Sequence, residues 1–96
     1  MKIVWDSAKA AANPKIHAGV TFEEAQSVLF DPFALTREDD DAEGEQRFVS
    51  LGMGGKERIL IVVYTYRDET IRLISAWKAS ESQRRRYENQ FRPDAR

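Results

Sequence analysis

The residues of this sequence that could do chemistry are mostly arginines, with a few acids and one histidine. Arginines recur along the most apolar stretch, residues 57–77, at Arg58, Arg67 and Arg72. The chain has no cysteine, one histidine (His17), and no serine, histidine and acid spaced for nucleophilic catalysis. Such a set suits RNA cleavage by the substrate's own 2′-hydroxyl. That reaction needs a base, positive charge for the phosphorane and a proton for the leaving oxygen, but no metal.

Each of these residues also has a purely structural explanation. Glu45 and Arg47 lie two apart, so they share a strand face if the strand begins that early, or they form a surface ion pair worth about 0–1 kcal/mol. Arg67 could decorate a turn, and His17 could be a hydrogen-bonded turn residue. Tyr64 is explained by β-propensity alone. Both readings of these residues stay open at this point.

The length and composition indicate one small domain spanning residues 1–96. Without cysteine, the chain has neither a disulfide framework nor a thiolate metal site. No apolar run approaches the roughly 20 residues that a membrane-spanning helix needs. Residues 1–6 become polar too soon for a signal peptide. We therefore expect a cytoplasmic protein that needs no membrane.

The charges are segregated along the chain although the net charge is only −1. Residues 1–45 carry a net charge of −6 and residues 46–96 carry +5. This asymmetry predicts an anionic partner for the second half, whereas the pI of about 5.8 argues against ordinary nonspecific nucleic-acid binding. Residues 38–45 hold six acids and predict a solvated loop. They lack the spacing of a calcium loop, so we expect no metal site there.

The pattern predicts an α+β domain whose centre is a hairpin within residues 57–77. Helices before and after a meander of three or four antiparallel strands would cover one face of the sheet and leave the other face open. Capping residues mark the expected helix starts at Asp6, at Thr21 with Glu24, and at Ser80 with Gln83. The expected elements are a strand at 3–5, a helix at 8–12 that Pro14 ends or kinks, a turn at 15–19, a helix from 21 to about 30, short strands near 33–37 and 46–51, the hairpin, and a last helix after 80.

The order of residues along the chain resembles the BrnT family of bacterial toxins. No single motif is specific, but the ordered set covers residues 3–88. The matching positions are Trp5-Asp6, Lys9, Asn13, His17, Gly19 to Ala25, Asp31-Pro32, Glu45, Arg47-Phe48, Gly52, Arg58, Val63 to Thr65, Arg67, Arg72 to Ala76, Ala79 and Arg84 to Glu88.

This resemblance implies a fold like that of the RelE-type toxins and a metal-independent endoribonuclease without a cofactor. It also implies a BrnA-like ribbon-helix-helix antitoxin, a hetero-oligomer with it, and operator DNA bound only through the antitoxin. The implied catalytic residues are His17, Glu45, Arg47, Arg67 and Arg72. The resemblance also implies Lys15 and Tyr64 as substrate-binding residues. We expect the same role for Arg58, which matches the family, and for Trp77, which departs from it. As hypotheses, Glu45 or His17 is the base, and Arg47 with Arg72 stabilises the phosphorane.

Three departures from the family pattern bear on activity. One residue is inserted around His17, Gln83 stands where an acid is common, and Trp77 stands where an arginine is usual. An indole cannot replace a guanidinium on a phosphate, although it can stack on a base. The alternative function is therefore a catalytically weakened toxin-fold protein that acts as antitoxin partner and co-repressor. A general RNA-binding domain is a third reading, which the pI disfavours.

Overall fold

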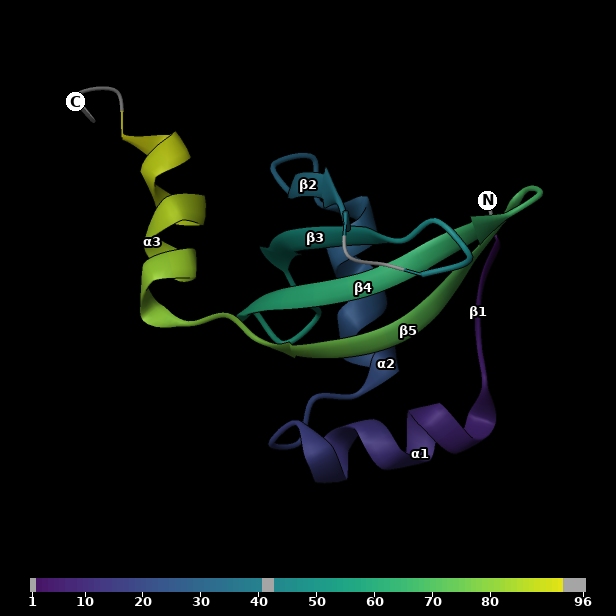
Figure 1. Ribbon diagram of the computed structural model, residues 1–96. Coiled ribbons are helices and arrows are strands. Elements are labelled where there is room, and N and C mark those ends of the chain that lie inside the picture. Colours follow the sequence, from purple (N-terminus) through teal and green to yellow (C-terminus); the bar gives the residue numbers. More distant parts are fainter. Residues whose placement is uncertain (1, 41–42, 93–96) are drawn as a thin grey trace.

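The computed structural model of the protein describes residues 2–40 and 43–92 (Figure 1). Five strands form one sheet in the order β1-β5-β4-β3-β2. The elements, in chain order, are β1 (Lys2–Trp5), α1 (Ser7–Ile16), α2 (Phe22–Ala25), the 3₁₀ helix η1 (Gln26–Phe30), β2 (Leu35–Glu38), β3 (Phe48–Met53), β4 (Ile59–Arg67), β5 (Thr70–Lys78), α3 (Glu81–Glu88) and the 3₁₀ helix η2 (Asn89–Phe91).

The sheet is mixed, so the prediction of three or four antiparallel strands is wrong in part. β2, β3, β4 and β5 form the expected antiparallel meander, but β1 pairs with β5 in parallel. A parallel pair needs a long crossover connection, because the chain must return to the same end of the sheet. Here β1 and β5 are more than 60 residues apart in sequence, and no local pattern in a four-residue strand specifies such a partner.

The central hairpin is confirmed, and it contains an irregularity that the sequence did not reveal. Val63 pairs with Ser75 but Tyr64 pairs with Leu73, so β5 has one extra residue at this point. Side chains alternate between faces in a regular strand, and a bulge reverses the alternation. Leu73 and Ala76 consequently both point into the same core. The residues just outside this pair, Arg72 and Trp77, therefore share the opposite face.

Each face of the sheet has its own core. On one face, Val20 and residues of α2 and η1 such as Phe22 pack against Leu60, Val62 and Leu73. On the other face, Tyr87 of α3 packs against a smaller cluster of Leu51, Ile59 and Ile61. The prediction that all helices cover one face is therefore wrong, because α2 and α3 pack on opposite faces of the sheet. Figure 1 shows α3 at one end of the sheet, where it leaves the rest of that face uncovered.

The N-terminal helices differ from expectation in detail. α1 runs through Pro14 to Ile16, so the turn expected from residue 15 begins only after Ile16. Thr21 accepts a hydrogen bond from the backbone N–H of Glu24, as predicted. The second half of that capping box is wrong, because the Glu24 carboxylate binds Arg58 instead. After one α-helical turn the chain narrows into η1, and Phe22 and Val28 point into the core.

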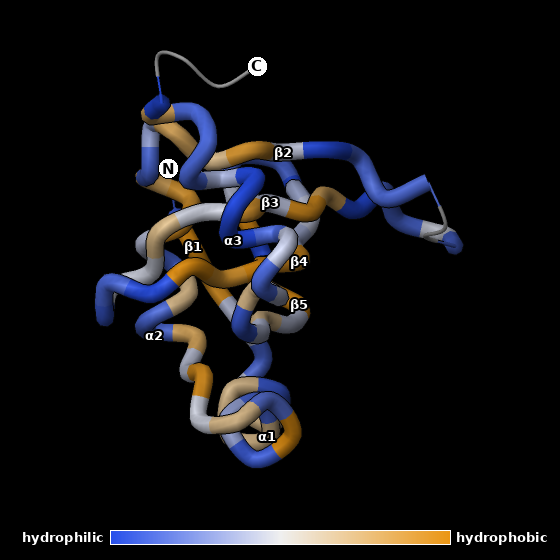
Figure 2. Tube along the Cα trace, turned by 90° about the vertical axis from the view of Figure 1, so that its left-hand side faces the viewer, coloured by the Kyte–Doolittle hydropathy of each residue, from blue (hydrophilic) through white to orange (hydrophobic). Residues whose placement is uncertain are grey.

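The last helix has the predicted capping box between Ser80 and Gln83. Tyr87 is buried, whereas its neighbour Phe91 remains 49% exposed and packs edge-on against Phe33. Figure 2 shows this helix as mostly hydrophilic beside strands that are largely hydrophobic. One aromatic side chain therefore supplies most of the apolar attachment of α3.

The structure also bears on the acidic stretch, on metal-binding groups and on membrane-spanning helices. Part of the acidic stretch 38–45, residues 41–42, lies outside the described residues. Among residues 2–40 and 43–92, no three histidine, cysteine or acidic side chains are grouped so that they could hold a metal ion. Over the same residues, no helix is long and apolar enough to cross a membrane.

Candidate functional site

Four charged residues gather at the turn end of the β4–β5 hairpin, on the face that α3 leaves uncovered. Arg67 Nε donates to both carboxylate oxygens of Glu45, at 3.0 and 2.8 Å. Arg72 lies opposite Thr65 in the β4–β5 register. Arg47 directly precedes Phe48, whose ring packs on Tyr64 on the helix side, so Arg47 points to the other face. We call Glu45, Arg47, Arg67 and Arg72 the arginine cluster.

Glu45 interacts electrostatically with all three arginines of the cluster. The hydrogen bond from Arg67 holds the pKa of the Glu45 carboxyl below its usual range, against an opposing effect of burial. The positive charges of Arg67, Arg47 and Arg72 lower this pKa further. Glu45 is therefore an ionised carboxylate at neutral pH, with three guanidinium groups close enough to stabilise it.

Arg72 also interacts with the start of α1. The Asp6 carboxylate caps that helix and accepts hydrogen bonds from the backbone N–H groups of Lys9 and Ala8, which are the main cause of its lowered pKa. The charge of Arg72 lowers the pKa of Asp6 further. Arg72 thus lies within electrostatic reach of two carboxylates, Asp6 and Glu45.

His17, at the end of α1, and Trp77 of β5 form a second group. Their ring centroids are 5.5 Å apart, with an angle of 38° between the ring planes. His17 is the C-cap of α1, and its backbone N–H donates to the carbonyl of Asn13 at 2.8 Å. The sequence predicted both residues as site candidates, but it did not indicate that they would touch.

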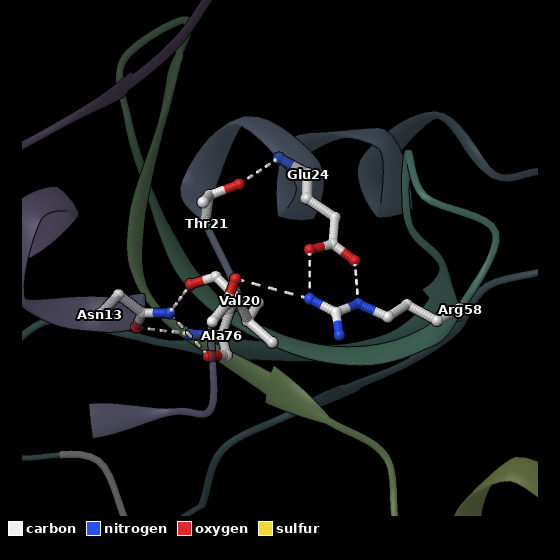
Figure 3. Close-up of polar contacts among 7 residues, drawn as sticks. Asn13, Val20, Thr21, Glu24, Arg58 and Ala76 are labelled. Carbon is white, nitrogen blue, oxygen red and sulfur yellow. Dashed lines mark hydrogen bonds and ion pairs between the residues drawn. The ribbon is translucent and has the colours of Figure 1, made fainter. Parts of the chain in front are cut away.

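Asn13 is the residue that brings His17 to Trp77. Its side-chain amide donates to the carbonyls of Ala76 and Val20, both at 2.8 Å, and its oxygen accepts from the Ala76 N–H at 3.2 Å (Figure 3). Since the pairing of β1 with β5 ends at Leu73, this amide serves as the partner of β5 at Ala76. Asn13 matches the family pattern but was not among the predicted site residues. The available signal was an asparagine, a poor helix former, in an alanine-rich helix.

A hollow of about 200 Å³ lies between this face of the sheet and α3. Its lining includes Trp77 of β5 and Val63 of β4. Charged and polar side chains that the sequence had not singled out as site residues complete it: Arg37, Asp39, Gln83 and Arg86. The hollow and the arginine cluster share one face of the sheet, because Val63 is only two residues from Thr65, the partner of Arg72.

The three remaining candidate residues belong neither to the arginine cluster nor to the His17–Trp77 pair. Arg58 precedes β4, at the opposite end from the cluster, and its guanidinium holds the fully buried carboxylate of Glu24, with Nη2 to Oε1 at 2.7 Å (Figure 3). Tyr64 is buried on the helix side of the sheet, where its hydroxyl is 2.9 Å from that of Ser50. Lys15 is exposed on α1, close to His17 in the chain.

Comparisons with known proteins agree with this architecture. A family model described as "Ribonuclease toxin, BrnT, of type II toxin-antitoxin system" matches residues 5–83. The fold resembles the crystal structure of the ribonuclease toxin BrnT of Brucella abortus, with a TM-score of 0.66 and 23% sequence identity. The match covers 84% of this chain and 99% of that one. A comparison with curated proteins gave no match. On the family match, this chain belongs to the BrnT ribonuclease toxins of type II toxin–antitoxin systems.

Proposed function

We propose that this protein is a metal-independent endoribonuclease that arrests growth by cutting RNA. The observation that carries the proposal is the arginine cluster, in which one ionised carboxylate lies among three guanidinium groups on an accessible sheet face. A base beside several fixed cations is what cleavage by the substrate's 2′-hydroxyl requires. Membership of a family of ribonuclease toxins supports the same reaction.

In the proposed reaction, Glu45 accepts the proton of the 2′-hydroxyl, and the resulting oxyanion attacks the adjacent phosphorus. Arg47 and Arg72 stabilise the negative charge of the phosphorane, and Arg67 orients Glu45 through its two hydrogen bonds. The bond to the 5′-oxygen then breaks, and that oxygen receives the proton that Glu45 accepted, which returns Glu45 to its ionised form. The products are a 2′,3′-cyclic phosphate and a 5′-hydroxyl. Of the two candidate bases, only Glu45 belongs to the arginine cluster, whereas His17 contacts Trp77.

The substrate-binding roles of Lys15, Arg58, Tyr64 and Trp77 differ in their support. Trp77 lines the hollow on the same face as the arginine cluster, which favours contact with an RNA base. Lys15 is exposed, so its ammonium group is accessible to an RNA phosphate. Arg58 and Tyr64 are engaged by Glu24 and Ser50, so we assign them to the fold.

The decisive experiment is RNA cleavage by the purified protein in the presence of EDTA. We expect cleavage to persist with EDTA and to fall at least about a hundredfold in Arg72→Ala, as for the loss of one charge-stabilising group. Arg84→Ala is the matched control, since Arg84 is an exposed arginine of α3 outside the cluster. Intact RNA after incubation with a folded wild-type protein would refute the proposal.

The same proposal includes a partner. A BrnA-like antitoxin with a ribbon-helix-helix part would bind the toxin as a hetero-oligomer, silence it in the cytoplasm, and carry the complex to operator DNA. The family description, which names a type II toxin–antitoxin system, supports an antitoxin in general. Expression of this chain alone should arrest growth, and co-expression of a ribbon-helix-helix protein encoded beside it should restore growth.

A second candidate function is a toxin-fold protein with weakened catalysis that serves as antitoxin partner and co-repressor. The position of Trp77 favours it, because the indole lies against His17 where a guanidinium is usual in the family. This candidate predicts tight antitoxin binding without toxicity. It also predicts that Trp77→Arg raises RNA cleavage, whereas under the first proposal that substitution lowers it or leaves it unchanged.

A further inference from the structure

The hollow between the sheet and α3 has the composition of a base-binding pocket. It adjoins the arginine cluster, since both lie along β4 on the same face. From Ile61, the partner of Trp77, to Thr65, the partner of Arg72, is four residues, or about 13 Å at the usual rise of a strand. This separation is longer than one nucleotide. An RNA strand held by its phosphates at the cluster could therefore place a neighbouring base over the hollow.

One wall of the hollow is aromatic. Trp77 lines it, and the indole is supported from the side by the imidazole of His17 and from below by the cluster around Ile61. An indole held in this way loses little conformational entropy when a base stacks on it. Stacking of a base on an aromatic side chain is worth about 1–3 kcal/mol and is tolerant of sequence. Selectivity must come from the other walls.

The other walls are rich in hydrogen-bond donors whose positions are partly fixed. The side-chain oxygen of Gln83 accepts from the Ser80 backbone N–H at 2.8 Å, so the capping box leaves the amide N–H groups of Gln83 for another acceptor. Arg37 and Arg86 bring two guanidinium groups from opposite sides, β2 and α3. The carboxylate of Asp39 lies in the same lining.

This combination matches guanine better than the other bases. Guanine presents two adjacent acceptors, O6 and N7, to which an arginine can donate both of its hydrogen bonds. Adenine presents an acceptor beside a donor at the same edge, and the donor would face the guanidinium.

We propose that the hollow lined by Trp77, Gln83, Arg37 and Arg86 is a subsite that binds a guanine base of single-stranded RNA. The subsite deepens the proposed ribonuclease function, on which it rests for the neighbouring phosphate contacts. It gives Trp77 the role of stacking platform and Gln83 that of a specificity-determining residue that α3 positions through its capping box.

The test follows the indole of Trp77 in the purified full-length protein. Trp5→Phe removes the other tryptophan, whose ring packs edge-on to Phe22, and leaves a single indole N–H resonance. We expect GMP to shift this resonance with an affinity about tenfold higher than AMP, UMP or CMP, the preference that about two extra hydrogen bonds provide.

Gln83→Glu is the sharpest variant, because glutamate keeps the capping bond to Ser80 and loses the amide donors. The negative charge that it adds repels all four nucleotides alike, so the ratio of affinities is the quantity to compare. Gln83→Glu should bring the ratio of GMP to AMP affinity to about one. Arg86→Ala should reduce that ratio several-fold. Arg84→Ala, on the same helix but outside the lining of the hollow, should leave the ratio unchanged. Equal affinities for the four nucleotides, or a GMP preference that survives in Gln83→Glu, would overturn the subsite.

RNA cleavage by the same samples separates the subsite from the ribonuclease proposal. Intact RNA together with a GMP-selective response would refute the ribonuclease and support the subsite. Cleavage without any preference for guanine, in titration or at the cut sites, would support the ribonuclease and refute the subsite.

Discussion

The arginines of the central apolar stretch serve different purposes, although the sequence presents them alike. Arg58 holds a buried carboxylate, Arg67 holds an exposed one, and Arg72 lies between the charges of Asp6 and Glu45. Spacing along the chain could not separate these roles. The difference comes from which end of β4, and which carboxylate, each guanidinium meets in the fold.

Arg58→Ala should destabilise the protein more than loss of any exposed arginine. The substitution leaves the fully buried carboxylate of Glu24 without its partner, and breaking a buried pair in this way costs about 3–5 kcal/mol. Urea unfolding followed by circular dichroism measures the change. Arg84→Ala is the control and should change the free energy of unfolding by about 0.5 kcal/mol or less.

The pH dependence of the same variant provides a check. The hydrogen bond from Arg58 lowers the pKa of Glu24, with burial opposing it. The wild-type protein therefore has this stability above the ordinary pKa of a glutamate and loses it as the pH falls through the lowered value. Arg58→Ala should lose much less stability over that acidic range. Parallel stability curves for the two proteins would contradict this account of the ion pair.

At the scale of elements, the geometry of β5 decides where the candidate residues lie. Arg72 and Trp77 are five residues apart and would point to opposite faces of a regular strand. The bulge in β5, opposite Val63 and Tyr64, puts Arg72 and Trp77 on the same face. The Asn13 side chain caps the open edge of β5 at Ala76. The site therefore depends on one extra residue and one amide, neither of which touches the proposed substrate.

Asn13→Ala should destabilise the protein by about 2–3 kcal/mol, because Ala76 loses partners for both its N–H and its carbonyl while it remains buried. Asn13→Asp should cost more, since a carboxylate would face the carbonyls of Ala76 and Val20. The tryptophan fluorescence should change in both variants as His17 moves from Trp77. If both variants unfold within about 0.5 kcal/mol of wild type, Asn13 does not hold the edge.

The attachment of α3 predicts a loss of stability at alkaline pH. Burial and the 2.5 Å hydrogen bond to Asp31 raise the pKa of Tyr87 to about 12. The neutral phenol is thus favoured in the folded state, so its contribution of about 2–3 kcal/mol is complete below pH 10 and is lost toward pH 12.

Tyr87→Phe tests this assignment. The variant should be less stable than wild type at neutral pH, because Asp31 loses a donor and stays partly buried. Its stability should also change less than that of wild type between pH 10 and 12. Thermal unfolding across this range measures both effects, and an equally steep alkaline loss in the variant would show that another group is responsible.

The sequence predicted the features that depend on residues close together in the chain. Ser80 and Gln83 form a capping box because both partners lie within one turn, and the hairpin forms because its apolar runs are adjacent. The parallel pairing of β1, the bulge in β5 and the Asn13 contact join residues far apart in sequence or depend on one unpaired residue. No spacing rule reports them, so the sequence indicated the candidate residues but not their grouping.

At the scale of the whole molecule, part of the positive charge of the second half of the chain gathers on one face of the sheet. The second half provides Arg47, just before β3, Arg67 and Arg72 of the β4–β5 hairpin, and Arg86 of α3. Acids from the first half, Asp6, Asp39 and Glu45, lie around these positions. Because acids surround the basic face, a polyanion would bind on that face rather than over the whole surface. This arrangement is consistent with an overall pI of about 5.8 in a family of ribonucleases.

The affinity for RNA should therefore fall with salt concentration only as steeply as a few phosphate contacts predict. Three cluster arginines on a single strand predict a slope of log affinity against log salt of about −2, since each contact contributes about −0.7. A 2′-O-methyl RNA allows the measurement without cleavage, because it lacks the attacking hydroxyl. Arg72→Ala should reduce the slope by about 0.7, whereas Arg84→Ala should leave it unchanged. A steeper slope of about −5, or equal effects of the two variants, would mean that RNA binds over the surface generally rather than at the cluster.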